Sequence, residues 1–162
     1  MANKFLPGIA GFVLVILVSN AALSSVPEGT LERSHLGVFG IITKNDQGDE
    51  KFRITDTVPL AEGQAYGWII KLEPGVRKVN VKEVFELPAK PETWGSGEAD
   101  MERSISKNGT ISTTEKMMVV EDGFIQNFWS VAAGDPPGDY VIRVYVDDRL
   151  LETFRFKVLE VR

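Results

Sequence analysis

Apolar and polar side chains alternate along several short stretches of this chain, and this alternation predicts β-strands. Residues 140–146 (YVIRVYV) alternate, an acidic turn at Asp147-Asp148 follows, and residues 150–158 alternate again. Successive side chains of a strand point to opposite faces, so the pattern predicts a β-hairpin. One face of its first strand would carry Tyr140, Ile142, Val144 and Val146. The other would carry Val141, Arg143 and Tyr145, which leaves room for something to pack on it.

The same pattern predicts eight or nine strands in the whole chain. Those before the hairpin are residues 36–43, 52–60, 65–72, 76–87, 101–106, 110–114 and 124–132. Turn residues separate them, most clearly Asn108-Gly109, a pair that favours a tight hairpin turn. No apolar stripe with the helical period of about 3.6 follows the N-terminal segment. The expected fold class is therefore all-β, an antiparallel β-sandwich.

Some of the predicted strands carry irregular residues. Residues 76–87 alternate imperfectly, and a β-bulge near residues 82–84 would restore the phase. Glu83 and Glu86 are unusual in so apolar a strand, and inward charges that protect a sheet edge are one explanation. Pro59 marks a strand end or a sheet edge, because proline cannot donate to a strand ladder.

The N-terminal segment has the pattern of a secretory signal. Lys4 is its positive charge, residues 5–18 are apolar, and small residues allow cleavage after Ala21 or Ser24. The apolar run is short for a membrane span, which needs roughly 17–25 residues. Residues 1–24 are thus predicted to be a signal peptide or an uncleaved anchor, 25–35 a linker, and 36–162 the sandwich domain. Both alternatives place the domain outside the cytoplasm. A cleaved signal would release it to the periplasm or the extracellular space, and an uncleaved segment would anchor it in the inner membrane.

Composition excludes several kinds of partner and site. The net charge of −5 disfavours nucleic acid and anionic lipid, which require clustered cations. The absence of cysteine excludes thiol nucleophiles, disulfides and Cys-ligated metals. His35 is the only histidine, and Ser34 beside it would point to the opposite face of a strand, so no Ser-His triad is expected. We predict no enzyme activity and no cofactor, with membrane contact only through an uncleaved N-terminal segment.

Three stretches carry a resemblance to a known kind of domain. They are GQAYGWIIKLEPG at residues 63–75, VNVKEVFELPAKPETW at 79–94 and PGDYVIRVYVDDRLLETFRFKV at 137–158. Together they resemble a bacterial family of small secreted or periplasmic domains with an immunoglobulin-like fold and no assigned function. The resemblance implies an immunoglobulin-like β-sandwich in the cell envelope. It brings no catalytic residues, because a fold by itself does not specify chemistry.

A few residues are candidates for contact with a partner. Trp94 lies in a loop between prolines and glycines rather than on a strand, and loop aromatics often anchor interfaces. The alternative is that Trp94 folds back and closes the open end of the sandwich. Glu92 in the same loop, Met117 and Tyr145 are further candidate contacts. Trp68 and Trp129 lie on alternating strands and are predicted to be in the core.

The acidic turn NDQGDE is the one weak candidate for a metal. Asp46, Asp49 and Glu50 could offer carboxylate oxygens to calcium. Their spacing does not match the EF-hand loop, so a solvated hairpin turn is the simpler explanation. No other metal site is expected.

These observations favour a non-catalytic exported domain that binds a protein of the cell envelope or assembles with it. One alternative is an accessory subunit of a membrane complex, anchored by its retained first helix. A second alternative is a small-ligand or carbohydrate-binding module that uses the Trp94 loop.

Overall fold

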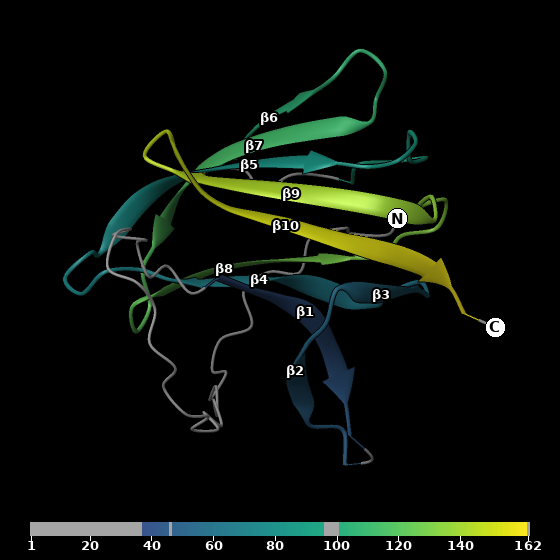
Figure 1. Cartoon of the computed structure of the whole chain (residues 1–162), viewed down its shortest axis with the longest axis horizontal. Helices are drawn as coiled ribbons and strands as arrows, with labels where there is room; N and C mark the ends of the chain where they lie inside the picture. Colours follow the sequence, from purple (N-terminus) through teal and green to yellow (C-terminus); the bar gives the residue numbers. More distant parts are fainter. Residues whose placement is uncertain (1–36, 46, 96–100, 162) are drawn as a thin grey trace, which may run out of the picture.

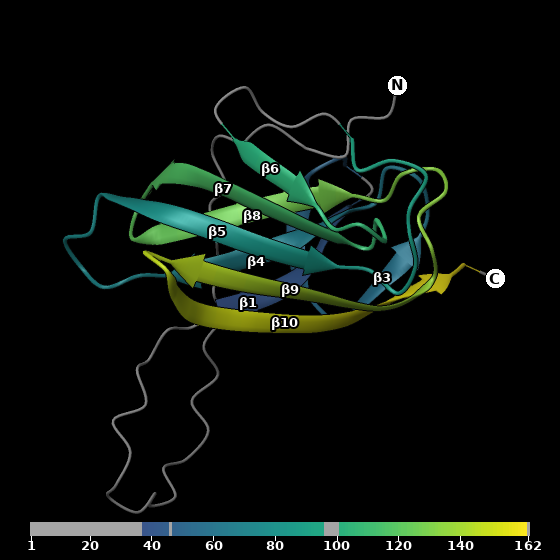
Figure 2. The same cartoon turned by 90° about the horizontal axis from the view of Figure 1, so that it is seen from above.

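Ten strands form two sheets that pack face to face in the computed structural model (Figures 1 and 2). The structure describes residues 37–45, 47–95 and 101–161. The predicted signal or anchor segment at 1–24 and the linker at 25–35 lie outside these residues, as do Ser34 and His35. Within the described ranges, no helix is long and apolar enough to cross a membrane.

The four-stranded sheet is antiparallel throughout. Its strands are β1 (Gly37–Lys44), β2 (Glu50–Ile54), β4 (Ala65–Lys71) and β8 (Phe124–Ser130), in the order β2-β1-β4-β8. β2 and β8 are its edges. This order brings the N-terminal hairpin next to two strands from the middle of the chain.

The six-stranded sheet has the order β3-β10-β9-β5-β7-β6. It comprises β3 (Thr57–Leu60), β5 (Lys78–Glu86), β6 (Glu102–Ile105), β7 (Ile111–Val119), β9 (Gly138–Val146) and β10 (Arg149–Glu160). Every pair is antiparallel except β3 and β10, which run parallel. Figure 2 looks onto this sheet, with the four-stranded sheet beneath it.

The main core lies between the two sheets and is rich in aromatic rings. Phe39, Tyr66, Phe85 and Phe156 are buried, and neighbouring rings lie 4.2–6.5 Å apart between centroids. Such rings bury large apolar areas, and tilted pairs add a further favourable term. Trp68 and Trp129 are buried here as well, as predicted: Trp68 is 0% exposed and Trp129 1%.

The closing hairpin confirms the prediction from its alternating pattern. Asp147 and Asp148 adopt φ angles of 48° and 64°, the left-handed conformation of a two-residue hairpin turn. The predicted inward face of β9 is buried throughout. One detail was not predicted: the pairing of β9 with β10 shifts register between Leu150 and Glu152. The buried face consists of Tyr140, Ile142, Val144 and Val146.

The loop before β9 is tied to that strand by a tyrosine. The Tyr140 hydroxyl donates a hydrogen bond to the Pro136 carbonyl oxygen at 2.7 Å. A tyrosine hydroxyl that bonds to the backbone a few residues upstream also marks a corner of immunoglobulin sandwiches.

The single strand predicted for residues 52–60 is wrong. The chain leaves the four-stranded sheet after Ile54, and β3 joins the six-stranded sheet beside β10. The backbone N–H of Lys157 donates to the Asp56 carbonyl oxygen at 2.8 Å and fixes this crossing. Pro59 lies in β3, an edge strand, which confirms its interpretation as an edge residue.

The bulge predicted near residues 82–84 is also wrong. β5 keeps a continuous register with β7 and with β9, so the alternation is regular and Glu83 belongs to its buried phase. β5 is a central strand, which rules out edge protection as the reason for its inward charge. The predicted break after residue 114 is absent, because β7 runs without interruption to Val119.

Candidate functional site

A buried carboxylate lies at the centre of the sandwich. Glu83 of β5 is 3% exposed and points toward the four-stranded sheet. Its Oε2 accepts hydrogen bonds from the indole Nε1 of Trp68 and from the Asn127 side-chain amide, the latter at 3.1 Å. Its Oε1 accepts one from the Trp129 indole Nε1 at 2.9 Å. One acid of the six-stranded sheet is therefore held by three donors from β4 and β8.

The protonation of Glu83 reflects two opposed effects. Burial raises the pKa of the Glu83 carboxyl, because a charged group loses its hydration inside the sandwich. The three N–H groups lower that pKa again, since each stabilises the carboxylate form. Burial is the larger effect, so the net pKa stays above the ordinary value of a glutamate.

Glu83 and Glu86 cannot act as a catalytic pair. They lie on opposite faces of β5, where Glu83 is enclosed and Glu86 Oε2 accepts from both terminal nitrogens of Arg143 at 3.1 Å. Paired carboxylates that hydrolyse glycosides must share one cleft. The geometry instead gives Glu83 a packing role and Glu86 a place in a surface ion pair.

Trp94 packs inward from its loop. Its indole Nε1 donates to the Gly109 carbonyl oxygen at 2.9 Å, and its ring meets the edge of Phe85 with 5.9 Å between centroids. The guanidinium of Arg103 holds the same loop, since its Nη1 donates to the carbonyl oxygens of Trp94 and Gly95 at 3.2 and 2.9 Å. This placement matches the alternative in which Trp94 closes the open side of the sandwich. A contact role for Trp94 or for the exposed Glu92 stays a prediction.

The acidic turn proposed for calcium is a hydrogen-bonded hairpin turn in its described part. Asn45 Oδ1 accepts from the backbone N–H of Asp49 at 2.8 Å, and its side-chain amide donates to the Asp49 carboxylate at 3.0 Å. Glu50 pairs with Lys44 at 3.3 Å. Asp46 lies outside the described residues. Nowhere in the described part of the chain do three His, Cys, Asp or Glu side chains gather as metal ligands would.

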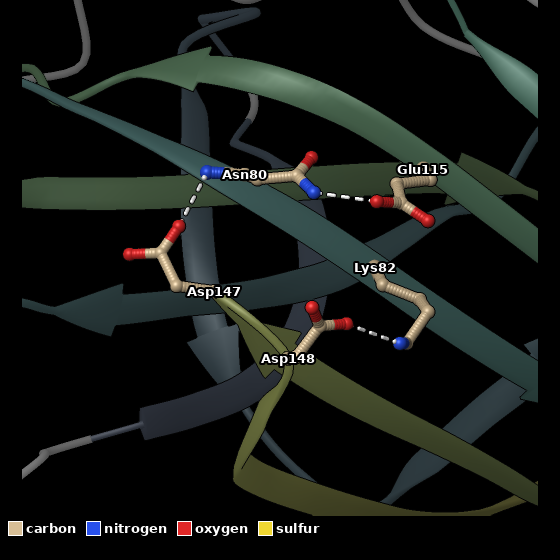
Figure 3. A network of polar contacts seen from close by, with 5 residues as sticks. All are labelled: Asn80, Lys82, Glu115, Asp147 and Asp148. Atoms are coloured by element: carbon tan, nitrogen blue, oxygen red, sulfur yellow. Dashed lines mark hydrogen bonds and ion pairs between the residues drawn. The ribbon is translucent and has the colours of Figure 1, made fainter.

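The outer face of the six-stranded sheet is mostly polar, and three of its ion pairs join neighbouring strands or the turn after β9. Figure 3 shows how the turn after β9 is fastened to β5. Lys82 Nζ lies 2.8 Å from the Asp148 carboxylate and 5.2 Å from the centre of the Tyr145 ring. Asp147 accepts from the backbone N–H of Asn80 at 3.1 Å. The Asn80 side-chain amide donates in turn to the Glu115 carboxylate.

The candidate contacts Met117 and Tyr145 lie on this polar face. Tyr145 is half-buried, and Lys82 covers its ring. Met117 is 52% exposed on β7. The sequence predicted that something could pack on the second face of the hairpin. At Tyr145 this position is taken by Lys82 of the same sheet.

The outer face of the four-stranded sheet is apolar and forms a second hydrophobic cluster. Three of its side chains are 7–8% exposed although they point away from the main core. No strand of the described chain packs on this face, because all ten strands belong to the two sheets. We call this surface the outer apolar face; it comprises Val38, Ile42, Phe52, Ala65, Ile69, Phe124 and Phe128.

Two glycines at the centre of the sheet leave room for the aromatic side chains of the outer apolar face. Gly40 pairs with Gly67, and Phe128 lies over Gly67, where a Cβ would be 2.7 Å from its ring. A Cβ at Gly67 would also lie 2.1 Å from the Asn127 carbonyl oxygen. Phe52 of β2 reaches Phe128 of β8 with 6.0 Å between ring centroids, although two strands separate them. Aromatic rings from the two edge strands of this sheet therefore meet above its central glycines.

A shallow, open hollow of about 310 Å³ lies where the chain crosses from β2 to β3. Phe39, Phe154 and the exposed Ile54 give it an apolar floor, and Asp56 and Arg155 lie at its polar side. Ligand pockets bury most of their ligand. This hollow is too open for that, so we do not regard it as a small-molecule site.

Sequence reasoning missed the outer apolar face as a unit. The first predicted strand was apolar on both faces, and Phe124 and Phe128 occupied alternate positions in their strand, which was the available signal. What the pattern did not show was that β1, β2, β4 and β8 bring these residues onto one surface.

Two of the solved structures that are similar to this chain come from different organisms. The chain is similar to a crystal structure of an immunoglobulin-like protein (PA1606) from Pseudomonas aeruginosa, with 14% identity, 76% of this chain and 92% of that one covered, and a TM-score of 0.48. A human F-spondin reeler domain (fragment 2) matches with 13% identity, 77% and 92% coverage, and a TM-score of 0.38. No match was found among curated proteins.

A sequence model of one family matches most of the chain. The match to the PM0630 beta sandwich domain covers residues 38–159, which is all of the ten strands except the first residue of β1 and the last residue of β10. It also includes the whole outer apolar face. The chain belongs to the PM0630 beta sandwich domain family.

Proposed function

We propose that this chain is a non-catalytic, exported β-sandwich domain that binds a protein partner through its outer apolar face. The observation that carries the proposal is this second hydrophobic cluster on the far side of a sheet. Large apolar patches on a domain surface commonly mark sites of protein interaction. The opposite outer face offers paired charges instead, which contribute little to affinity.

The arrangement of the acids supports a role without catalysis. Glu83, the carboxyl group with the most perturbed surroundings, is enclosed by three donors and has no path to a substrate. The exposed acids with described partners lie in ion pairs or turns. A domain with this chemistry is better suited to binding than to turnover.

A photoreactive side chain tests the binding surface. We would place a photoreactive phenylalanine at Ile54, which is 68% exposed beside the outer apolar face, and irradiate cells that export the protein. The matched control carries the same group at Val119, which is 64% exposed on the outer face of the six-stranded sheet. We expect a discrete crosslinked protein from position 54 alone. Equal labelling at both positions, or none at either, would overturn the proposal.

The N-terminus of the purified protein tests the proposed export. The pattern of residues 1–24 supports secretion, with cleavage after Ala21 or Ser24. A mature protein that begins at Ala22 or Ser25 would support a released domain and exclude the anchored accessory subunit. An intact Met1 in the membrane fraction would favour the anchored subunit, and an intact Met1 in the cytoplasm would contradict export.

A further inference from the structure

β8 is the least protected sheet edge in the described part of the chain. The other three edge strands carry features that discourage pairing with another chain. β2 has five residues, three of them charged; β3 has four and contains Pro59; β6 has four and contains Glu102 and Arg103. β8 (FIQNFWS) has seven residues, none of them charged and none proline.

The hydrogen-bond phase of β8 turns the backbone groups of its even-numbered residues away from β4. Leu72 N–H donates to the Gly123 carbonyl oxygen at 2.8 Å, and Val131 N–H donates to that of Gln64 at 3.0 Å. With the observed register, odd-numbered residues of β8 therefore bond to β4. The backbone N–H and C=O groups of Gln126 and Phe128 face away from β4. No described strand pairs with β8 on that side.

We propose that β8 pairs antiparallel with β8 of a second copy of this chain, about a two-fold axis at Asn127. In this register Gln126 lies opposite the partner's Phe128, and Phe128 lies opposite the partner's Gln126. Each such pair exchanges two backbone hydrogen bonds, so four bonds satisfy the backbone groups of Gln126 and Phe128 in both copies. The two four-stranded sheets become one sheet of eight strands. The proposal goes beyond the proposed function, because this pairing uses the edge of the sheet and leaves the outer apolar face open to a different protein.

The chemistry of β8 favours its own copy over a different protein. A heterologous partner is usually steered and selected by complementary charge, which β8 does not offer. A strand that meets itself across a two-fold axis must avoid bringing like charges together, and β8 meets that condition. Phe124 and Phe128 also belong to the outer apolar face, so the pairing joins the clusters of the two copies.

Sedimentation equilibrium of the full chain, from about 1 µM to 1 mM, tests the pairing. We expect a reversible monomer–dimer equilibrium. Gln126→Lys should weaken dimerisation by roughly tenfold or more, because a charge on an edge strand discourages pairing. The matched control is Ser104→Lys, which adds the same charge to the exposed edge strand β6 and should leave dimerisation unchanged. Both variants retain residues 1–36, so association through that segment would persist in both.

Two further variants keep the test independent of stability. Gln126→Pro removes the N–H group that faces away from β4, at an edge position where proline is tolerated. We expect this variant to be monomeric, and its melting temperature shows whether the domain still folds. The natural chain has no cysteine, so the Gln126→Cys variant carries a single thiol. A short bis-maleimide should crosslink two copies of this variant, whereas it should not crosslink the Ser104→Cys variant. A monomeric wild type, or equal effects of the lysine substitutions, would overturn the pairing. If position 54 still captured a different protein, the proposed function would stand without it.

Discussion

The two sheets of this domain distribute polar groups in opposite ways. The six-stranded sheet carries paired ions on its outer face and one carboxylate, Glu83, on its inner face. The four-stranded sheet is apolar outside and presents three N–H donors inside, from Trp68, Asn127 and Trp129. In both sheets, whether a side chain is buried depends on the groups around it and not only on its own polarity. An acid is stable in this core because donors surround it, and phenylalanines are stable on an outer face because they gather there.

The strongest test of this comparison is Glu83→Ala. The substitution leaves three buried donors without an acceptor, so we expect the free energy of unfolding to fall by roughly 3–5 kcal/mol. Urea denaturation measures the loss. Glu86→Ala, three positions away on the outer face of the same strand, should cost less than about 1 kcal/mol. Similar losses for both variants would mean that the buried network contributes no special stability.

Phe128→Ala tests the cluster on the outer side of the four-stranded sheet. Phe128 is 8% exposed and rests on Gly67, so its removal should lower the free energy of unfolding by about 3 kcal/mol. The matched change on the other outer face is Tyr145→Ala, for which we expect about 1 kcal/mol because that ring is only half-buried. Equal losses would show that the two outer faces are packed alike.

The pH dependence of stability sharpens the comparison at Glu83. The folded pKa is raised by burial, so the folded state binds a proton more readily than the unfolded chain does. The stability of the wild type relative to Glu83→Gln should therefore fall as pH rises above the ordinary glutamate pKa of 4.5, and level off above the raised value. The slope would reach at most about 1.4 kcal/mol per pH unit. An opposite slope in paired urea titrations would show that the three donors outweigh burial.

Lys82→Met is expected to have the smallest effect. Lys82 and Asp148 form an exposed pair, in which the bond raises the pKa of the amine and lowers that of the carboxyl. Exposed ion pairs contribute little to stability because water and salt screen them. Urea unfolding should not resolve the variant from the wild type, either in low salt or in 1 M NaCl. A clear loss would reveal a role for this turn beyond solvation.

Local patterns predicted the strands better than they predicted which residues meet. The alternation over residues 140–146 and the Asn108-Gly109 turn identified two hairpins, because both signals reside in adjacent residues. The alternation across Thr55 and Asp56 gave no sign that the chain changes sheets there. The most buried residue of the strand is even-numbered both before and after this point. That change depends on β10, which is about a hundred residues away.

The candidate site was harder to predict than the fold. Glu83 stood out as an acid in an apolar strand. Of its three donors, however, one lies 15 residues before it in the chain and the other two lie 44 and 46 residues after it. Only the packing of β4 and β8 beneath β5 shows that these donors converge on one carboxylate. The apolar character of β8 was visible in the sequence, but its position at a sheet edge was not.

The parallel pairing of β3 with β10 has a consequence for how the chain reaches its folded state. It joins residues 57–60 to residues 157–160, so a loop of about a hundred residues must close before the six-stranded sheet is complete. Folds dominated by such distant contacts form slowly. During synthesis, β3 would have no neighbour in its sheet until β10 emerges. The four-stranded sheet needs no residue beyond Ser130, so it could form before the last strand of the six-stranded sheet is available.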